Sequence, residues 1–338
     1  MNRRRIGKTG LEVTEYSFGG ASLGNLYHAV TRPDAMATLD AAWNAGMRYF
    51  DTAPHYGFVL SERRFGDFLQ GKPRNDYVLS TKVGRLLQPV PEDQVPDLGF
   101  VEPLPFKERY DYSYDGIMRS VEDSYARLGL NRIDILYVHD IGVYTHGIEL
   151  TRMHLAQLLD GGLKALEELK SSGVIAAYGL GVNEVEICLE VMRRAPLDCI
   201  LLAGRYSLLD RSAEAELIPL CRKAQTSLVI GGVFNSGILA TGARPGSNFD
   251  YGKAPPEILS KVTAMEEIAA QGRYPLAAAA MRFPLDEPTV ATVLIGTAKA
   301  SSIKRNMDLL DIGVPPGDYE KYRRHTTVQA PLTGAVRE

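Results

Sequence analysis

One stretch of this chain says most about its fold and chemistry: Tyr49-Phe50-Asp51-Thr52-Ala53-Pro54-His55-Tyr56-Gly57. Apolar residues with strand character place Asp51 at the end of a strand, and a loop then carries Tyr56. Two later segments with strand character end on Lys82 and on His139. We predict that these four side chains meet in one site and transfer protons in carbonyl or alcohol redox chemistry.

Strand-like and helix-like segments alternate outward from this stretch, from about residue 15 to residue 310. The strand-like segments lie near residues 15–18, 47–51, 77–82, 133–138, 175–180, 199–203, 226–231 and 290–295. They are apolar on both faces, as expected of a parallel sheet that helices cover. Eight such units in order predict an α/β fold, a (β/α)8 TIM barrel formed as a single domain over residues 1–338.

The segments between the strands have helical periodicity. Apolar residues recur at the spacing of one helical face at 117–128 and again at 155–166. Gly46, Gly129 and Gly173 stand where helices should end, because a left-handed residue often terminates a helix.

Two long loops interrupt this alternation. Residues 85–112 are rich in Pro, Asp and Tyr and have no period, and residues 240–256 form a second irregular segment. Both follow strands, so both should project from the C-terminal face, where the active sites of such barrels lie. The tail after residue 312 has no regular pattern and is expected either to cross that face or to be mobile.

Composition excludes several classes of function. The net charge of −3 favours neither nucleic acid nor an anionic membrane surface. No apolar stretch reaches about 18 residues, and no apolar segment follows the basic start of the chain, so we expect neither a membrane span nor a signal peptide. The three cysteines form no C-x-x-C pair and are expected to be buried and reduced, without a metal. We therefore expect a cytoplasmic protein.

Each of the four candidate residues alone has an ordinary structural explanation, such as a helix cap or a packed aromatic ring. Their joint position at strand ends favours catalysis. An unperturbed tyrosine has a pKa near 10, too high for an efficient base at neutral pH, whereas a neighbouring ammonium such as Lys82 favours the phenolate. A partly buried lysine needs a carboxylate, which Asp51 supplies, and His139 can hydrogen-bond the substrate oxygen.

The chain resembles the aldo-keto reductase superfamily over nearly its whole length, from Gly7 to Asn306. Its F-D-T-A-x-x-Y-G motif, its Thr81-Lys82 strand end and its Val138-His139 pair match the family's Asp/Tyr/Lys/His tetrad. The resemblance implies a nicotinamide cofactor that lies extended across the barrel mouth and is bound without a Rossmann fold.

The resemblance also implies cofactor ligands near the ends of three later strands. Asn183 matches the asparagine of the family's G-x-S/T-N turn, in which Val182 here replaces the hydroxyl residue. It would bind the nicotinamide carboxamide, although an asparagine there is also compatible with a helix cap. Tyr206 matches the tyrosine at the sixth strand end, where Ala203 replaces a common glutamine. Gly231 stands where an aromatic residue commonly stacks on nicotinamide, and Phe234 is the substitute.

The last βα turn matches the family's coenzyme-phosphate segment, where backbone amides and a helix N-terminus suit a phosphate. Its expected cofactor contacts are Gly296, Thr297, Lys299, Ser302 and the adenine-contacting Asn306. Ser302 replaces an arginine that in NADP-preferring relatives pairs with the 2′-phosphate, which favours NAD over NADP. The nearby cations Lys299 and Arg305 favour NADP instead.

Within the superfamily the chain is similar to aldose 1-dehydrogenases for L-fucose, L-galactose or other D-threo-aldoses. Ser61-Glu62, residues 201–206 and His139-Asp140-Ile141 carry this likeness. The main prediction is therefore oxidation of an aldose at C1 to the lactone. The alternative is a pyridoxal 4-dehydrogenase that forms 4-pyridoxolactone. A non-catalytic, cofactor-binding partner subunit is disfavoured because the tetrad is complete.

The two candidate substrates require different side chains in the wall of the pocket. A sugar needs polar partners, for which the candidates are His55, Asp140, Tyr27, His28 and Arg205. Pyridoxal needs an aromatic slot, for which the candidates are Tyr27, Trp43 and Phe58, although Trp43 is expected to lie in the core on the first helix. The expected partner is a small molecule in either case, and the sequence predicts no oligomeric state.

Overall fold

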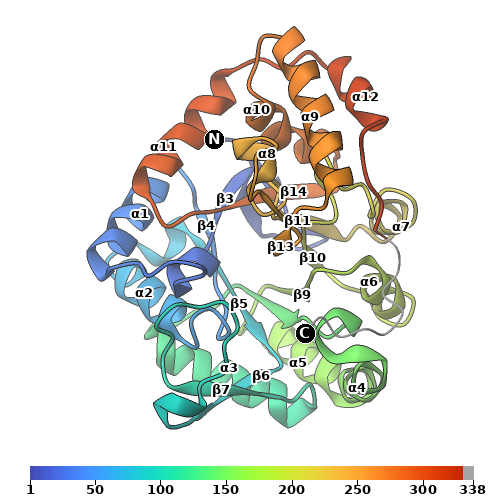
Figure 1. The fold of residues 1–338 in the computed structure, drawn as a ribbon. Coiled ribbons are helices and arrows are strands. Elements are labelled where there is room, and N and C mark those ends of the chain that lie inside the picture. Colours follow the sequence, from blue (N-terminus) through green and yellow to red (C-terminus); the bar gives the residue numbers. More distant parts are fainter. Residues whose placement is uncertain (330–338) are drawn as a thin grey trace.

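The computed structural model describes residues 1–329 and contains a closed barrel of eight parallel strands, around which the helices are arranged (Figure 1). The strands follow each other around the barrel in chain order, and the last pairs with the first. They are β3 (Tyr16–Gly19), β4 (Tyr49–Asp51), β5 (Val78–Val83), β8 (Ile135–His139), β9 (Ala177–Val182), β10 (Cys199–Ala203), β11 (Ser227–Gly231) and β14 (Val290–Gly296). The predicted (β/α)8 barrel is confirmed.

Helices connect successive strands and cover the outside of the barrel. They are α1 (Arg32–Asn44), α2 (Leu60–Leu69), α3 (Tyr114–Leu128), α4 (Val143–Gln157), α5 (Leu163–Ser171), α6 (Val185–Met192), α7 (Leu217–Ala224), α8 (Ile238–Thr241), α9 (Pro256–Gln271), α10 (Leu276–Arg282), α11 (Ala300–Asp308) and α12 (Asp318–Arg323). Gly129 ends α3 in the left-handed conformation, with φ of 62°, as predicted. A π-helical turn at Leu158–Gly162 joins α4 to α5, so the predicted second helix is divided.

The hydrophobic core has an inner and an outer part. Residues that point into the barrel, among them Tyr49, Ile135 and Tyr137, form the inner cluster. The outer cluster lies between the strands and the helices. The N-terminal hairpin of β1 (Arg3–Arg5) and β2 (Glu12–Thr14) adds Ile6 and Val13 to the inner cluster and so closes the N-terminal end of the barrel.

Three segments contain more regular structure than the sequence suggested. Residues 85–112 contain an antiparallel hairpin of β6 (Arg85–Pro89) and β7 (Phe106–Tyr110), joined through the 3-10 turn Glu92–Gln94. Residues 240–256 contain a small hairpin of β12 (Asn248–Phe249) and β13 (Gly252–Lys253). The expectation of an irregular tail after residue 312 is wrong for α12, which docks through the buried Tyr322. The rest of this tail, residues 330–338, lies outside the described residues.

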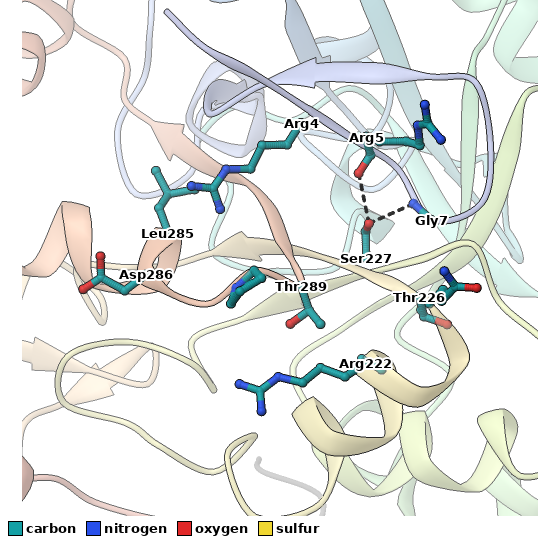
Figure 2. A pocket seen from close by; sticks show the side chains of 12 residues that line it. Arg4, Arg5, Gly7, Arg222, Thr226, Ser227, Leu285, Asp286 and Thr289 are labelled. Carbon is teal, nitrogen blue, oxygen red and sulfur yellow. Dashed lines mark hydrogen bonds between the residues drawn. The ribbon is translucent and has the colours of Figure 1, made fainter.

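A cavity of about 600 Å³ lies at the end of the barrel where the strands begin (Figure 2). Ser227, the first residue of β11, accepts a hydrogen bond there from Gly7 N at 2.8 Å and donates one to Arg5 O at 3.1 Å. These contacts fasten the N-terminal hairpin to the barrel. This cavity is therefore at the opposite end from the four candidate residues.

Within residues 1–329, no helix has the length and apolarity needed to cross a bilayer. Cys188, Cys199 and Cys221 are buried and unpaired, in agreement with the expectation from sequence.

Candidate active site

The four predicted residues lie together at the C-terminal mouth of the barrel. Asp51 and His139 are the last residues of β4 and β8, and Lys82 lies near the end of β5. Lys82 Nζ is 2.7 Å from Asp51 Oδ2 and 2.9 Å from Thr52 O. The same ammonium lies 4.8 Å from the centre of the Tyr56 ring, which is 6.0 Å from the imidazole of His139.

Asp51 is held from inside the barrel as well as by Lys82. Ser80 Oγ donates to Asp51 Oδ1 at 2.6 Å, and the Ser80 hydroxyl also lies 2.9 Å from Tyr49 Oη. Burial raises the pKa of Asp51, while Lys82 and Ser80 oppose that rise. The carboxylate therefore depends on these donors, since an isolated buried charge is costly.

Tyr56 is held by the tight approach of two backbone segments. Gly57 has a φ of 66°, and a Cβ at Gly24 would lie 2.4 Å from the carbonyl carbon of Tyr56. Burial raises the pKa of the Tyr56 phenol well above 10, and Asp51 and Asp140 add to this effect. We expected the ammonium of Lys82 to favour the phenolate, whereas burial shifts the pKa of Tyr56 in the opposite direction.

His139 is neutral in this setting. Burial lowers the pKa of its imidazole well below 6.5, and the cations Arg85 and Lys82 lower it further. Its Nε2 lies 3.3 Å from Asp140 Oδ2, whereas its buried Nδ1 has no hydrogen-bond partner among the described residues. A neutral imidazole offers one donor and one acceptor, which suits hydrogen bonding to an uncharged alcohol or carbonyl oxygen.

The hairpin β6–β7 supplies two functional candidates that the sequence interpretation missed. Arg85 donates from β6 to both oxygens of Glu108, at 3.1 Å, and to Asp140 Oδ2 at 2.5 Å. Glu108 on β7 also lies 2.7 Å from His55 Nδ1. The sequence interpretation found no period in this segment, but Phe106, Glu108 and Tyr110 alternate with Lys107 and Arg109, and this alternation is the signal that could have identified β7.

A cavity of about 750 Å³ opens over this site. The side chains that line it include three of the four predicted catalytic residues, Tyr56, Lys82 and His139. Aromatic residues form a second part of the wall: Tyr27, Phe100, Tyr110, Tyr144 and Tyr251. The cavity therefore combines a proton-transfer set with an aromatic lining.

The structure separates the predicted substrate-binding candidates. Three of them, His55, Asp140 and Tyr27, line the cavity. Arg205 is instead buried in an ion pair with Asp250, at 2.9 Å, and His28 is exposed outside the lining.

The aromatic candidates other than Tyr27 lie away from the cavity. Trp43 packs on Phe50 at 6.2 Å and under the Arg48 guanidinium at 4.0 Å, against the outer core, as expected of a core residue on the first helix. Phe58 is fully buried and supports the ring of His55 from 6.3 Å.

Only one of the three predicted nicotinamide ligands lines the cavity. Asn183 follows β9 and lines the cavity, where Tyr251 Oη donates to its Oδ1 at 3.3 Å. It does not cap α6, whose N-cap residue is Glu184. Tyr206 packs on Phe283 at 5.0 Å, and Phe234 follows β11 and packs against the core. Their contacts with a cofactor stay predictions.

The turn after β14 fits a dinucleotide phosphate. Gly296 and Thr297 lead to Lys299, whose backbone N–H donates to Thr297 Oγ1 at 3.2 Å. No side chain caps α11, and in its first turn Ser302 N donates to Lys299 O at 2.9 Å, so an anion would meet the N–H groups that precede Ser302. Arg305 donates to Ser302 Oγ at 3.2 Å.

The adenine candidate, Asn306, is buried on the same helix. An uncapped helix start, two cations and a buried amide are the donor types that a nicotinamide dinucleotide requires. These residues would hold its phosphates and adenine, and Asn183 its carboxamide.

Comparison with known proteins agrees with this geometry. The model of the aldo/keto reductase family matches residues 16–326. The chain belongs to the aldo/keto reductase family. It is an NAD(P)-dependent oxidoreductase of the kind that acts on CH–OH donors.

This aldo/keto reductase is similar to two curated enzymes along most of its length. It is 46% identical to a pyridoxal 4-dehydrogenase from Microbacterium luteolum over 322 residues, which cover 93% of this chain and 94% of the relative. It is 38% identical to a D-threo-aldose 1-dehydrogenase from a Pseudomonas species, with 91% and 92% covered. The holo form of an aldo-keto reductase from Bacillus halodurans matches with a TM-score of 0.77, 25% identity and coverage of 98% and 99%.

Proposed function

We propose that this aldo/keto reductase oxidises pyridoxal to 4-pyridoxolactone. The observation that carries the proposal is the 46% identity to a pyridoxal 4-dehydrogenase across nearly the whole of both chains. The aromatic wall that includes Tyr27 and Phe100 supports it, because a pyridine ring can stack against such side chains. The comparisons thus favour the alternative over the aldose that the sequence interpretation placed first.

Oxidation of an aldose remains the second candidate. Two observations favour it: the 38% identity to a D-threo-aldose 1-dehydrogenase, and the polar side chains of His55 and Asp140 in the cavity wall. Both substrates form cyclic hemiacetals, and both become lactones when the hemiacetal carbon loses a hydride and its hydroxyl loses a proton. One catalytic set therefore serves either reaction.

The residues of the mouth have separable roles in this proposal. The nicotinamide, when bound, accepts the hydride. His139 donates a hydrogen bond to the hemiacetal oxygen and holds it beside Tyr56. Tyr56 takes the hydroxyl proton in oxidation and returns it in reduction, and the Lys82–Asp51 pair keeps a positive charge 4.8 Å from the phenol ring.

For the cofactor we propose NAD in preference to NADP. Ser302 lacks the bidentate donors that would pair with a 2′-phosphate. Arg305 is the nearest substitute, but its guanidinium is exposed and hydrogen-bonded to Ser302.

Initial rates of reduced-cofactor formation test the proposal. Pyridoxal, L-fucose, L-galactose and D-arabinose should each be assayed with NAD and with NADP at mildly alkaline pH, because the oxidation releases a proton and is favoured there. We expect the highest kcat/KM with pyridoxal and NAD, and 4-pyridoxolactone as the product. Turnover of the sugars alone would replace pyridoxal by an aldose and leave the mechanism intact.

A further inference from the structure

Asp140 has a backbone conformation that is uncommon for a residue other than glycine. It follows His139 directly and has a φ of 43°, in the left-handed region that few residues other than glycine adopt. Its N–H donates to Gly181 O at 2.9 Å, which ties the end of β8 to the neighbouring strand β9. Such conformations persist where the surroundings impose them and are frequent at functional sites. Here the side chain lines the cavity.

The carboxylate of Asp140 is surrounded by hydrogen-bond donors. Arg85 Nη2 is 2.5 Å from Oδ2, and the imidazole Nε2 of His139 is 3.3 Å from the same oxygen. Asn183 Nδ2 lies 3.4 Å from Oδ1. Glu108 holds Arg85 from the other side, so the arginine is shared between two carboxylates. Asp140 thus lies between the catalytic imidazole and the predicted carboxamide ligand.

We propose that Asp140 determines substrate specificity by accepting a hydrogen bond from the hydroxyl group next to the hemiacetal carbon. This inference rests on the proposed function, in which the hemiacetal oxygen binds His139 Nε2. Because Asp140 Oδ2 lies 3.3 Å from that nitrogen, a substituent beside the reacting oxygen reaches the carboxylate. An aldose presents its C2 hydroxyl there, on the carbon bonded to the hemiacetal carbon. Pyridoxal presents its 3-hydroxyl, on the ring carbon next to the one that carries the hemiacetal carbon. Arg85 and Glu108 are positioning residues that hold the acceptor in place.

A substrate and its deoxy analogue test this role. The preference is the ratio of kcat/KM for pyridoxal to that for 3-deoxypyridoxal, or for L-fucose to 2-deoxy-L-fucose. A hydrogen bond to a charged group predicts a preference of about 10- to 100-fold in the wild-type enzyme. Asp140→Ala should reduce the ratio to near one, and the nearly isosteric Asp140→Asn should give an intermediate ratio.

Asp134→Asn is the matched control. Asp134 is also a buried carboxylate paired with an arginine, with Arg74 Nη2 at 2.6 Å, but it precedes β8 at the other end of the barrel. We expect the substrate ratio to be unchanged in this variant, even if it is less stable.

The outcomes separate the two proposals. Wild-type enzyme that oxidises both members of a pair equally well contradicts the role of Asp140 alone. An Asp140→Ala or Asp140→Asn variant whose kcat/KM falls by the same factor for the substrate and for its deoxy analogue also contradicts this role, because a purely structural effect lowers both values equally. Wild-type enzyme that oxidises neither pair contradicts the proposed function and this inference with it. If Asp140→Ala does not fold, the wild-type and Asp140→Asn ratios still decide the question.

Discussion

The ammonium of Lys82 is only 2% exposed and lies against Asp51 Oδ2 and Thr52 O. Removing one partner of a buried ion pair leaves the other charge uncompensated, at a cost of about 3–5 kcal/mol. We predict that Asp51→Asn lowers the free energy of unfolding by that amount, as measured by urea denaturation. The double variant Asp51→Asn/Lys82→Met should recover part of the loss. A loss below about 1 kcal/mol in the single variant would contradict a tightly coupled pair.

Ser302 is the residue at which coenzyme choice should respond to a single change. Ser302→Arg places a guanidinium at the start of α11, beside Lys299, where it can pair with a 2′-phosphate. We predict that the ratio of kcat/KM for NADP to that for NAD rises about 10- to 100-fold, from a wild-type ratio below one. A wild-type enzyme that already prefers NADP would contradict the assignment.

The candidate residues that sequence could predict are those adjacent to strand ends. Asp51, Lys82 and His139 lie at or next to the last residue of a strand. Because parallel strands of a barrel end on the same side, their meeting at one mouth could be predicted. Arg85 and Glu108 could not be placed in this way, because they meet the site only after a hairpin folds back over the mouth. Their partners are far apart in the sequence, and no local pattern specifies those contacts.

At the scale of elements, the loop that carries Tyr56 packs backbone to backbone against the 3-10 turn Ala21–Gly24. A Cβ at Gly24 would lie 2.4 Å from the Tyr56 carbonyl carbon, so Gly24→Ala must displace the loop. We predict a kcat reduced by about 10- to 100-fold, since small displacements of catalytic groups are costly.

Gly10→Ala serves as the control for Gly24→Ala, because a Cβ at Gly10 meets no atom within 4 Å. It should leave kcat unchanged. Equal kcat values in the two variants would show that the close approach does not position Tyr56.

Helix α4 carries a buried histidine that should make stability depend on pH. His146 Nε2 lies 3.0 Å from Tyr112 Oη, and burial, followed by the effect of His154, lowers its pKa to about 3. Between that pKa and the ordinary value of about 6.5, the unfolded chain binds a proton that the folded chain does not. Acidification therefore lowers the free energy of unfolding, and His146 contributes at most about 1.4 kcal/mol of this decrease per pH unit.

We predict that His146→Gln makes the free energy of unfolding fall less steeply between about pH 6 and about pH 4. Denaturant titrations at several pH values in this range measure the slope. The two proteins should have parallel pH dependence above about pH 7, where the histidine is neutral in both states. An unchanged slope at acidic pH would mean that His146 is protonated in the folded state.

For the whole molecule, the barrel was predictable because eight βα units follow one another and parallel strands need covering helices. The substrate was less predictable. The cavity wall is assembled from loops after several different strands, and each of those loops contributes only one or a few side chains. Trp43 illustrates the difficulty, since this aromatic candidate packs on Phe50 and against the outer core instead of lining the cavity.

The central claim is that Tyr56 moves the proton in a nicotinamide-dependent oxidation at this mouth. The most direct test is turnover of Tyr56→Phe with pyridoxal and NAD, together with NADH binding measured by fluorescence titration. The account predicts an unchanged dissociation constant for NADH and a kcat lower by about 10²- to 10⁴-fold, because the phenol ring remains and only the proton-transfer group is lost. A variant that binds NADH normally and turns over at the wild-type rate would contradict it.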